Sequence, residues 1–196
     1  MVRQFDEDAV LEKVLEVFWN RGWQATSMAD LAAAVNVQRG SLYHAYGGKE
    51  HLFELAFDRY ATRVLAESRA ALDAPSARLA LKQFFDVSIA SMTADTPPRG
   101  CFTTKTAVES DAIGERMQNR VRILLESLEA LVAEALSRDG RNSSLADPPD
   151  EIAKMVIAFT RGLAVMERIY HEPKRLHDLS ESLIDLLVQP LHQNNP

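Results

Sequence analysis

The apolar residues of this 196-residue chain recur at spacings of three and four almost from one end to the other. Val10, Val14 and Phe18 form one such stripe near the start. This period is that of an amphipathic α-helix, and the sequence contains no alternating β-branched runs bounded by turn residues. The pattern therefore predicts an all-α protein of about nine helices.

Glycine and proline divide the helical pattern into segments. Gly22 ends the first stripe, Gly47-Gly48 precedes a long helix, and Pro173 separates the last two helices. Three short or medium helices come first, and a longer helical bundle follows. We therefore expect an N-terminal domain over residues 1–48 and a C-terminal domain over residues 49–196.

Composition excludes several classes of protein. Hydrophobic residues make up 46% of the chain and charged residues 26%, which is ordinary for a folded soluble protein. No stretch approaches the ~20 apolar residues of a membrane span, and the acidic start does not resemble a signal peptide. A single cysteine, Cys101, excludes an intrachain disulfide and fits a reducing compartment, so we expect a cytoplasmic protein. The net charge of −6 argues against general affinity for nucleic acid.

The segment from Thr26 to Leu52 has the pattern of a helix-turn-helix. Ser27 precedes Asp30 by three residues, which is a weak form of the capping box. Asn36 is suited to a left-handed turn, and a second short helix is predicted to begin near Gln38. Two short helices joined by a tight turn can place the second helix in the major groove of DNA.

The second short helix carries suitable chemistry for DNA. Gln38 and Arg39 can form bidentate contacts with base edges, and the small Gly40 permits close approach. Hydroxyl, imidazole and ammonium donors nearby can bind phosphates. Residues 36–49 carry a charge of +2, unlike the acidic chain as a whole. The predicted DNA-binding residues are Thr26, Ser27, Gln38, Arg39, Gly40, Ser41, Tyr43, His44 and Lys49.

These residues resemble the DNA-binding domain of the TetR family of transcriptional regulators. The likeness lies in Phe18–Trp23, Thr26–Ala32, Val37–Tyr46 and Lys49–Phe53. It implies an all-helical homodimer with an N-terminal DNA reader and a C-terminal ligand-binding and dimerisation domain. The implied function is a sequence-specific regulator, typically a repressor released from a palindromic operator by a small molecule or a thiol-reactive signal.

Two other function classes are compatible with a helical chain. One is a sensor or adaptor without DNA binding, and the other is an enzyme that uses Cys101 or a histidine. The sequence has no Gly-rich phosphate loop, no His-Glu-x-x-His and no second cysteine, and its histidines are scattered. We therefore expect no enzymatic activity, no cofactor and no metal. The expected partners are double-stranded operator DNA, a second copy of the chain and a small-molecule effector.

The stretch Arg99–Glu109 resembles the Gly-Cys segment that opens the sixth helix in a subset of the TetR family. Lys105 stands where asparagine is usual. In the family this helix links the ligand domain to the DNA reader, and some members use a cysteine there to sense oxidants or electrophiles. Cys101 is therefore either a sensor or a buried structural thiol.

The resemblance also implies a small-molecule pocket set between the fourth to seventh helices. Aromatic and methionine stripes also occur in plain cores, so the sequence leaves both readings open. The candidate pocket residues are Phe57, Tyr60, Phe84, Phe85, Ser88, Met92, Cys101, Phe102, Met117 and Arg120.

Apolar stripes on the last two helices fit an interface between two copies of the chain. Two helices from each subunit can close a four-helix interface about a two-fold axis, and a small residue permits close approach. The alternative is that both stripes serve the internal core. The candidate interface residues are Met155, Phe159, Gly162, Leu163, Met166, Leu179, Leu183, Leu186 and Leu187.

Overall fold

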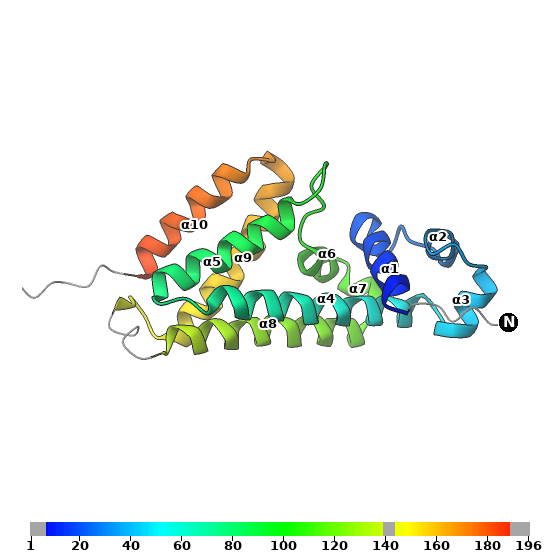
Figure 1. Cartoon of the computed structure of the whole chain (residues 1–196), viewed down its shortest axis with the longest axis horizontal. Helices are drawn as coiled ribbons and strands as arrows, with labels where there is room; N and C mark the ends of the chain where they lie inside the picture. The colour runs from blue at the N-terminus through cyan, green and yellow to red at the C-terminus, as the bar shows by residue number, and fades with distance from the viewer. Residues whose placement is uncertain (1–6, 139–143, 189–196) are drawn as a thin grey trace, which may run out of the picture. The chain divides into compact units, whose positions relative to one another are not determined.

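The structure, a computed structural model, describes residues 7–138 and 144–188. These residues form ten α-helices and an isolated antiparallel bridge between Leu145 and Val188, which confirms the all-α prediction (Figure 1). The helices are α1 (Glu7–Arg21), α2 (Met28–Ala34), α3 (Arg39–Tyr46), α4 (Lys49–Leu72), α5 (Ala77–Thr93), α6 (Phe102–Val108), α7 (Ser110–Ile113), α8 (Glu115–Leu136), α9 (Pro149–Tyr170) and α10 (Pro173–Leu187).

The described chain forms two compact units. The first comprises the described residues up to Val64 together with Phe102–Arg122. The second comprises Leu65–Cys101 together with the described residues from Ile123 onward. The first unit therefore contains α1, α2, α3, α6 and α7. The domain boundary expected between residues 48 and 49 stays a prediction.

The helix ends of the first unit follow from local sequence. Gly22 adopts a φ of +80°, a left-handed conformation that ends α1 as its glycine predicts. Asn36 adopts a φ of +55° in the turn between α2 and α3, as the sequence also indicates. Gly114, with a φ of +101°, separates α7 from α8.

An aromatic cluster forms the core of the first unit. Phe18, Trp19, Phe53 and Phe102 are each at most 2% exposed. The Phe18 and Phe53 rings meet edge to face with centroids 4.6 Å apart, and the Trp19 and Phe102 centroids lie 5.5 Å apart. Aromatic pairs at such separations stabilise a core beyond their buried area. They join α1, α4 and α6 into one packed body.

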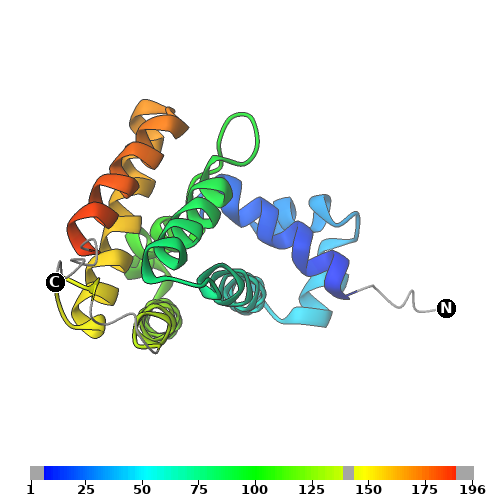
Figure 2. The same ribbon diagram turned by 60° about the vertical axis from the view of Figure 1, so that its left-hand side comes forward.

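The second unit is built on three neighbouring helices, α5, α9 and α10, which lie side by side in both views (Figures 1 and 2). Ser76 caps α5 by accepting a hydrogen bond from the Leu79 N–H at 3.2 Å. His171 ends α9 with a φ of +52°, and Pro173 opens α10.

The described helices contain none that is long and apolar enough to cross a membrane. Within the same residues, no group of three or more His, Cys, Asp or Glu side chains is placed to hold a metal ion.

Candidate nucleic-acid interface

The start of α2 is fixed by the predicted capping box. The Ser27 N–H donates to Asp30 Oδ2 at 2.8 Å, and the Asp30 N–H donates to Ser27 Oγ at 3.2 Å. Arg21 adds an ion pair with Asp30 at 2.6 Å. The hydrogen bonds from Ser27, with those from Arg21, lower the pKa of Asp30 to about 2. The cap that defines this helix is therefore held by an ionised carboxylate.

The turn after α2 directs the chain into α3. Asn36 takes the left-handed conformation, and the Val37 N–H donates to the Ala32 carbonyl at 3.0 Å. Gln38 is the N-cap residue of α3, but its side chain makes no capping hydrogen bond and is exposed. The amide of Gln38 is therefore available at the outer surface.

One face of α3 anchors it and the other faces outward. Leu42 is 3% exposed and packs inward. Arg39, Gly40, Ser41 and His44 are exposed, and the exposed fraction of Tyr43 is 41%. The Arg39 guanidinium carbon lies 5.5 Å from the centroid of the Tyr43 ring. Among described atoms, nothing lies within 4 Å of where a Cβ at Gly40 would stand.

An open cleft of about 470 Å³ borders this face. It is bounded by the start of α2, by two side chains of α3 and by the start of α4. The arginine, lysine and hydroxyl groups in its lining are the types that bind phosphate. The lining residues are Thr26, Ser27, Met28, Ala29, Arg39, Tyr43, Gly48, Lys49 and Glu50.

Two predicted DNA-binding residues form hydrogen bonds within the protein. Thr26 is 2% exposed, and its hydroxyl donates to the Gly22 carbonyl at 2.7 Å. Lys49 Nζ donates to the carbonyls of Trp23 and Thr26 at 3.0 and 2.9 Å. Both side chains thus hold the backbone of the segment between α1 and α2. Their contact with DNA stays a prediction.

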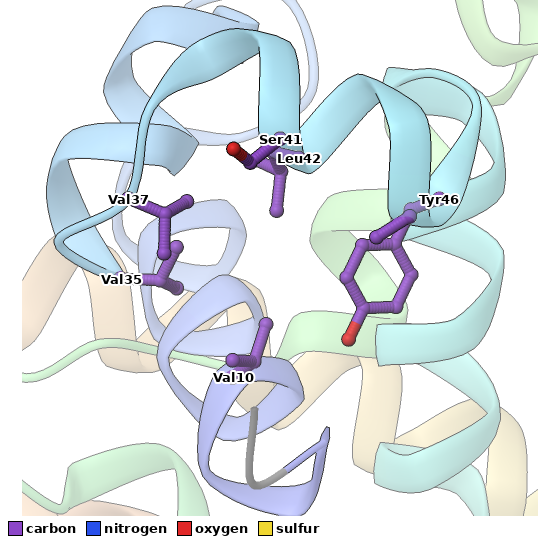
Figure 3. A pocket seen from close by; sticks show the side chains of 7 residues that line it. Val10, Val35, Val37, Ser41, Leu42 and Tyr46 are labelled. Atoms are coloured by element: carbon purple, nitrogen blue, oxygen red, sulfur yellow. The ribbon is translucent and has the colours of Figure 1, made fainter. Parts of the chain in front are cut away.

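A small apolar pocket lies behind α3 (Figure 3). Val10, Val35, Val37 and Leu42 surround a cavity of about 10 Å³, room for at most one water. Tyr46 borders the same pocket, and burial, together with the charge of Glu7, raises the pKa of its phenol. The inner side of α3 therefore packs, through Leu42, against valine side chains from α1 and from the α2–α3 turn.

Sequence reasoning missed several residues at this site. Met28, Ala29, Gly48 and Glu50 line the cleft, beside residues that were predicted. Glu109 lies far away in the sequence, yet it accepts hydrogen bonds from the backbone just after α1. The adjacency of the first four to predicted residues was a usable signal. No local pattern could reveal the contact of Glu109.

Five of the candidate pocket residues lie in the first unit. Phe57, Tyr60, Phe102 and Met117 are each at most 4% exposed. The Tyr60 and Phe102 rings lie 5.2 Å apart, and the Tyr60 and Thr103 hydroxyls are 3.0 Å apart. Arg120 pairs with Asp58 at 2.5 Å. Phe57, Tyr60, Phe102 and Met117 fill the core of their unit, whereas Arg120 is half-buried. Contact of all five with an effector stays a prediction.

The other five candidate pocket residues lie in the second unit. Phe84, Phe85 and Met92 are each at most 2% exposed, while Ser88 is half-buried. Cys101 is also half-buried, and its Sγ lies 3.6 Å from Arg161 Nη1. The cationic neighbour distinguishes this thiol from one packed among apolar groups alone.

The candidate interface residues divide by exposure. Met155, Met166 and Leu186 are exposed by 41%, 39% and 72%, Gly162 is exposed, and Phe159, Leu179 and Leu183 are half-buried. Leu163 and Leu187 are 1% and 4% exposed, so they belong to the core of the second unit. The exposed face also includes three apolar residues that were not predicted, Val165, Ile169 and Tyr170.

Two short helices, a left-handed turn between them, an outward polar face and a phosphate-suited cleft define a helix-turn-helix DNA-binding protein. Residues 10–56 match the family described as bacterial regulatory proteins, tetR family. Residues 77–183 match the tetracyclin repressor-like C-terminal domain. The chain belongs to the TetR family and is a DNA-binding transcriptional regulator, as the sequence resemblance predicted.

Named relatives agree with this membership. The HTH-type transcriptional repressor ComR of Escherichia coli K12 is 31% identical over 140 residues, which cover 68% of this chain and 67% of ComR. A cysteine mutant of the TetR family regulator CifR, solved with a 26-bp operator duplex, is 30% identical with a TM-score of 0.81, over 94% and 98% of the two chains. Reduced E. coli NemR shares the fold, with 19% identity and a TM-score of 0.82, over 93% and 99% of the two chains. ComR and CifR are both named as transcriptional regulators.

Proposed function

We propose that this protein is a homodimeric cytoplasmic repressor that binds a palindromic operator and leaves it when an effector binds. The α3 helix of each subunit enters the major groove, and the starts of α2 and α4 meet the flanking backbone. ComR is named a repressor, and CifR is solved with operator DNA, so both support this direction for the present chain.

The outward face of α3 is the observation that carries the proposal. Gln38 and Arg39 stand exposed at the start of the helix, where they can present amide and guanidinium groups to base edges. Gly40 adds no side chain between them and the groove. A face assembled only for solubility would not need this combination of bidentate donors and open approach.

The cleft beside α3 supports a role in phosphate binding. Arg39 and Ser27 line it, and the first turns of α2 and α4 border it, so N–H groups at helix starts can add to the side-chain donors. The Lys49 ammonium is already bound to two carbonyls, so it supplies positive potential more than a new hydrogen bond.

The exposed apolar face of α9 and α10 supports dimerisation. Met155, Met166 and Ile169 on α9 and Leu186 on α10 are apolar side chains with 39% to 72% exposure. Patches of this kind mark interaction sites, and a two-fold axis through them would pair two DNA readers for a palindrome.

The effector enters the proposal in two forms. One is a small molecule held by the helical C-terminal domain. The other is a thiol-reactive compound acting at Cys101, which the guanidinium of Arg161 favours because a neighbouring cation stabilises a thiolate.

Selection from a pool of random DNA duplexes tests the proposal. The purified protein should enrich an inverted repeat whose half-sites lie about one helical turn or a multiple of it apart. A pool that shows no enriched sequence after repeated rounds would contradict sequence-specific binding. Enrichment of a single unrepeated site would contradict the dimeric arrangement alone.

A further inference from the structure

The six-residue connection between α1 and α2 is held by a carboxylate from a distant part of the chain. Glu109, between α6 and α7, accepts the Trp23 N–H at Oε2 over 2.8 Å and the Gln24 N–H at Oε1 over 3.2 Å. These partners are 86 and 85 residues apart in the sequence. Each oxygen takes one peptide N–H, so a single ionised side chain fixes two successive peptide groups.

The same connection is held by its carbonyls from the start of α4. Lys49 Nζ donates to the Trp23 and Thr26 carbonyls and lies 3.9 Å from the centroid of the Trp23 ring. Trp23 therefore sits between two opposite charges, with its N–H on Glu109 and its carbonyl on Lys49. The last turn of α1 is held as well, because Lys105 of α6 donates to the Trp19 carbonyl.

The Glu109 carboxylate lies so close to Gly22 that a side chain at residue 22 would collide with it. A Cβ at Gly22 would stand 2.8 Å from Glu109 Oε2 and 3.0 Å from Oε1. The carboxylate therefore occupies the space that a side chain at residue 22 would need. Thr26, whose hydroxyl binds the Gly22 carbonyl, closes the connection four residues later.

This connection ends directly at the DNA-facing cleft. Thr26 and Ser27 line the cleft, and Ser27 is the N-cap that fixes where α2 begins. A shift of the connection would move the start of α2, and with it the α2–α3 pair, relative to α1 and α4. The hydrogen bonds of Glu109 therefore hold the segment that leads into the α2–α3 helix pair.

We propose that Glu109 is a positioning residue for DNA recognition: its carboxylate holds the α1–α2 connection in the conformation that binds the operator. The inference rests on the DNA-binding function, and it assigns an acidic residue a favourable part in binding a polyanion. Electrostatics alone predicts the opposite effect on affinity, because removing a negative charge ordinarily strengthens binding to DNA. The two explanations therefore predict opposite results.

The test compares Glu109→Gln with Asp111→Asn in the full-length protein. Asp111 is exposed on α7, two residues away, so Asp111→Asn makes the same charge change without touching the connection. In Glu109→Gln one amide oxygen can still accept an N–H, but the amide NH₂ faces the second N–H as a donor against a donor. Affinity is measured by titrating the selected operator duplex, with circular dichroism checking that each variant is folded.

The expected result is a loss of operator affinity of about tenfold or more in Glu109→Gln, because losing a charge-assisted hydrogen bond changes an equilibrium by that order. Asp111→Asn should bind as tightly as the wild type or slightly more tightly. Hydrogen exchange should quicken at the Trp23 and Gln24 amides in Glu109→Gln and stay unchanged within α5 and α9. Equal or higher operator affinity in Glu109→Gln overturns the inference.

Two further variants keep the test decisive. If Glu109→Gln does not fold, Glu109→Asp retains the charge and withdraws the carboxylate by one methylene, and it should also weaken operator binding. Wild-type affinity in Glu109→Asp would then overturn the inference. Arg39→Ala separates this inference from the proposed function: if Arg39→Ala loses binding and the Glu109 variants do not, only the role of Glu109 fails. If the wild type selects no duplex, both fail.

Discussion

Single residues at helix ends set the geometry of the helix-turn-helix formed by α2 and α3. Gly22 turns the chain after α1, Ser27 and Asp30 cap α2, and Asn36 turns into α3. Each of these residues satisfies backbone groups that a short helix would otherwise leave to water. Their contributions can be separated because Gly22 and Asn36 act through backbone conformation, whereas Ser27 and Asp30 act through hydrogen bonds and charge.

Replacement of Gly22 by alanine should destabilise the protein. The φ of +80° disfavours an L side chain by about 1–2 kcal/mol, and the new Cβ would also displace the Glu109 carboxylate. Urea unfolding measures the change in free energy. Gly40→Ala is the control. Gly40 lies in a helix with open space around it, so this substitution should raise the free energy of unfolding by about 0.5–1 kcal/mol. Equal stability of the two variants would contradict this account of Gly22.

The charge of Asp30 should give the protein a distinct acid dependence. Its pKa is about 2 in the folded state and 3.8 ordinarily, so its contribution is fully present above about pH 4. The contribution is then lost as the pH falls through about 2. The difference in unfolding free energy between wild type and Asp30→Asn should shrink over this window. A constant difference down to the lowest pH would show that the carboxylate does not stabilise the fold.

At the scale of elements, the spacing of apolar residues predicted a helix well where its apolar face packs against a single hydrophobic core. The long helix expected after Gly47-Gly48 is α4, and Pro173 separates α9 from α10 as expected. The pattern did not predict the short helix α7, which is separated from α6 by a single glutamate and from α8 by a single glycine. Periodicity does not register such breaks, because both flanking helices continue the same apolar spacing.

The exposed apolar face on α9 and α10 should control assembly. Ile169→Glu and Leu186→Glu each place a charge where 69% and 72% of the side chain is exposed, so the monomer fold should persist while association fails. Sedimentation velocity should show monomers for both. Val108→Glu is the matched control, because Val108 on α6 is 81% exposed and lies in the other unit. Dimers in both α9 and α10 variants would exclude this face as the interface.

At the scale of the whole molecule, the net charge of −6 contrasts with a small cationic reading segment. Residues 36–49 carry Arg39 and Lys49 and no acidic residue. Non-specific binding to DNA depends on the number of phosphate charges neutralised, so this chain should bind random duplexes weakly. In the proposed homodimer, affinity for an operator comes from specific contacts and from the pairing of two α3 helices.

The sequence predicted the reading helix and its exposed residues because both depend on neighbours within a few positions. It could not show that Thr26 is buried or that Lys49 binds two carbonyls, since these depend on how α4 meets the α1–α2 connection. It likewise assigned Leu163 to an interface, because a stripe on a helix does not reveal whether its partner is internal.

Modification of the single cysteine should report on signalling through the C-terminal domain. N-ethylmaleimide should lower operator affinity in the wild type and leave Cys101→Ser unaffected, and untreated Cys101→Ser should bind normally. Arg161→Met should slow the alkylation, because the cation next to Sγ is lost. Normal operator binding by fully alkylated wild type would exclude a thiol-reactive signal at this position.

The most direct test of the account is operator affinity in Arg39→Ala, measured against Arg122→Ala as a matched control. Both variants remove one exposed arginine from the first unit, but only Arg39 lies on the outer face of α3. Loss of a base-edge contact should cost about tenfold or more on the operator and little on a scrambled duplex. Arg122→Ala should match the wild type on both duplexes. Unchanged operator affinity in Arg39→Ala, or an equal loss in both variants, would contradict recognition of DNA by α3.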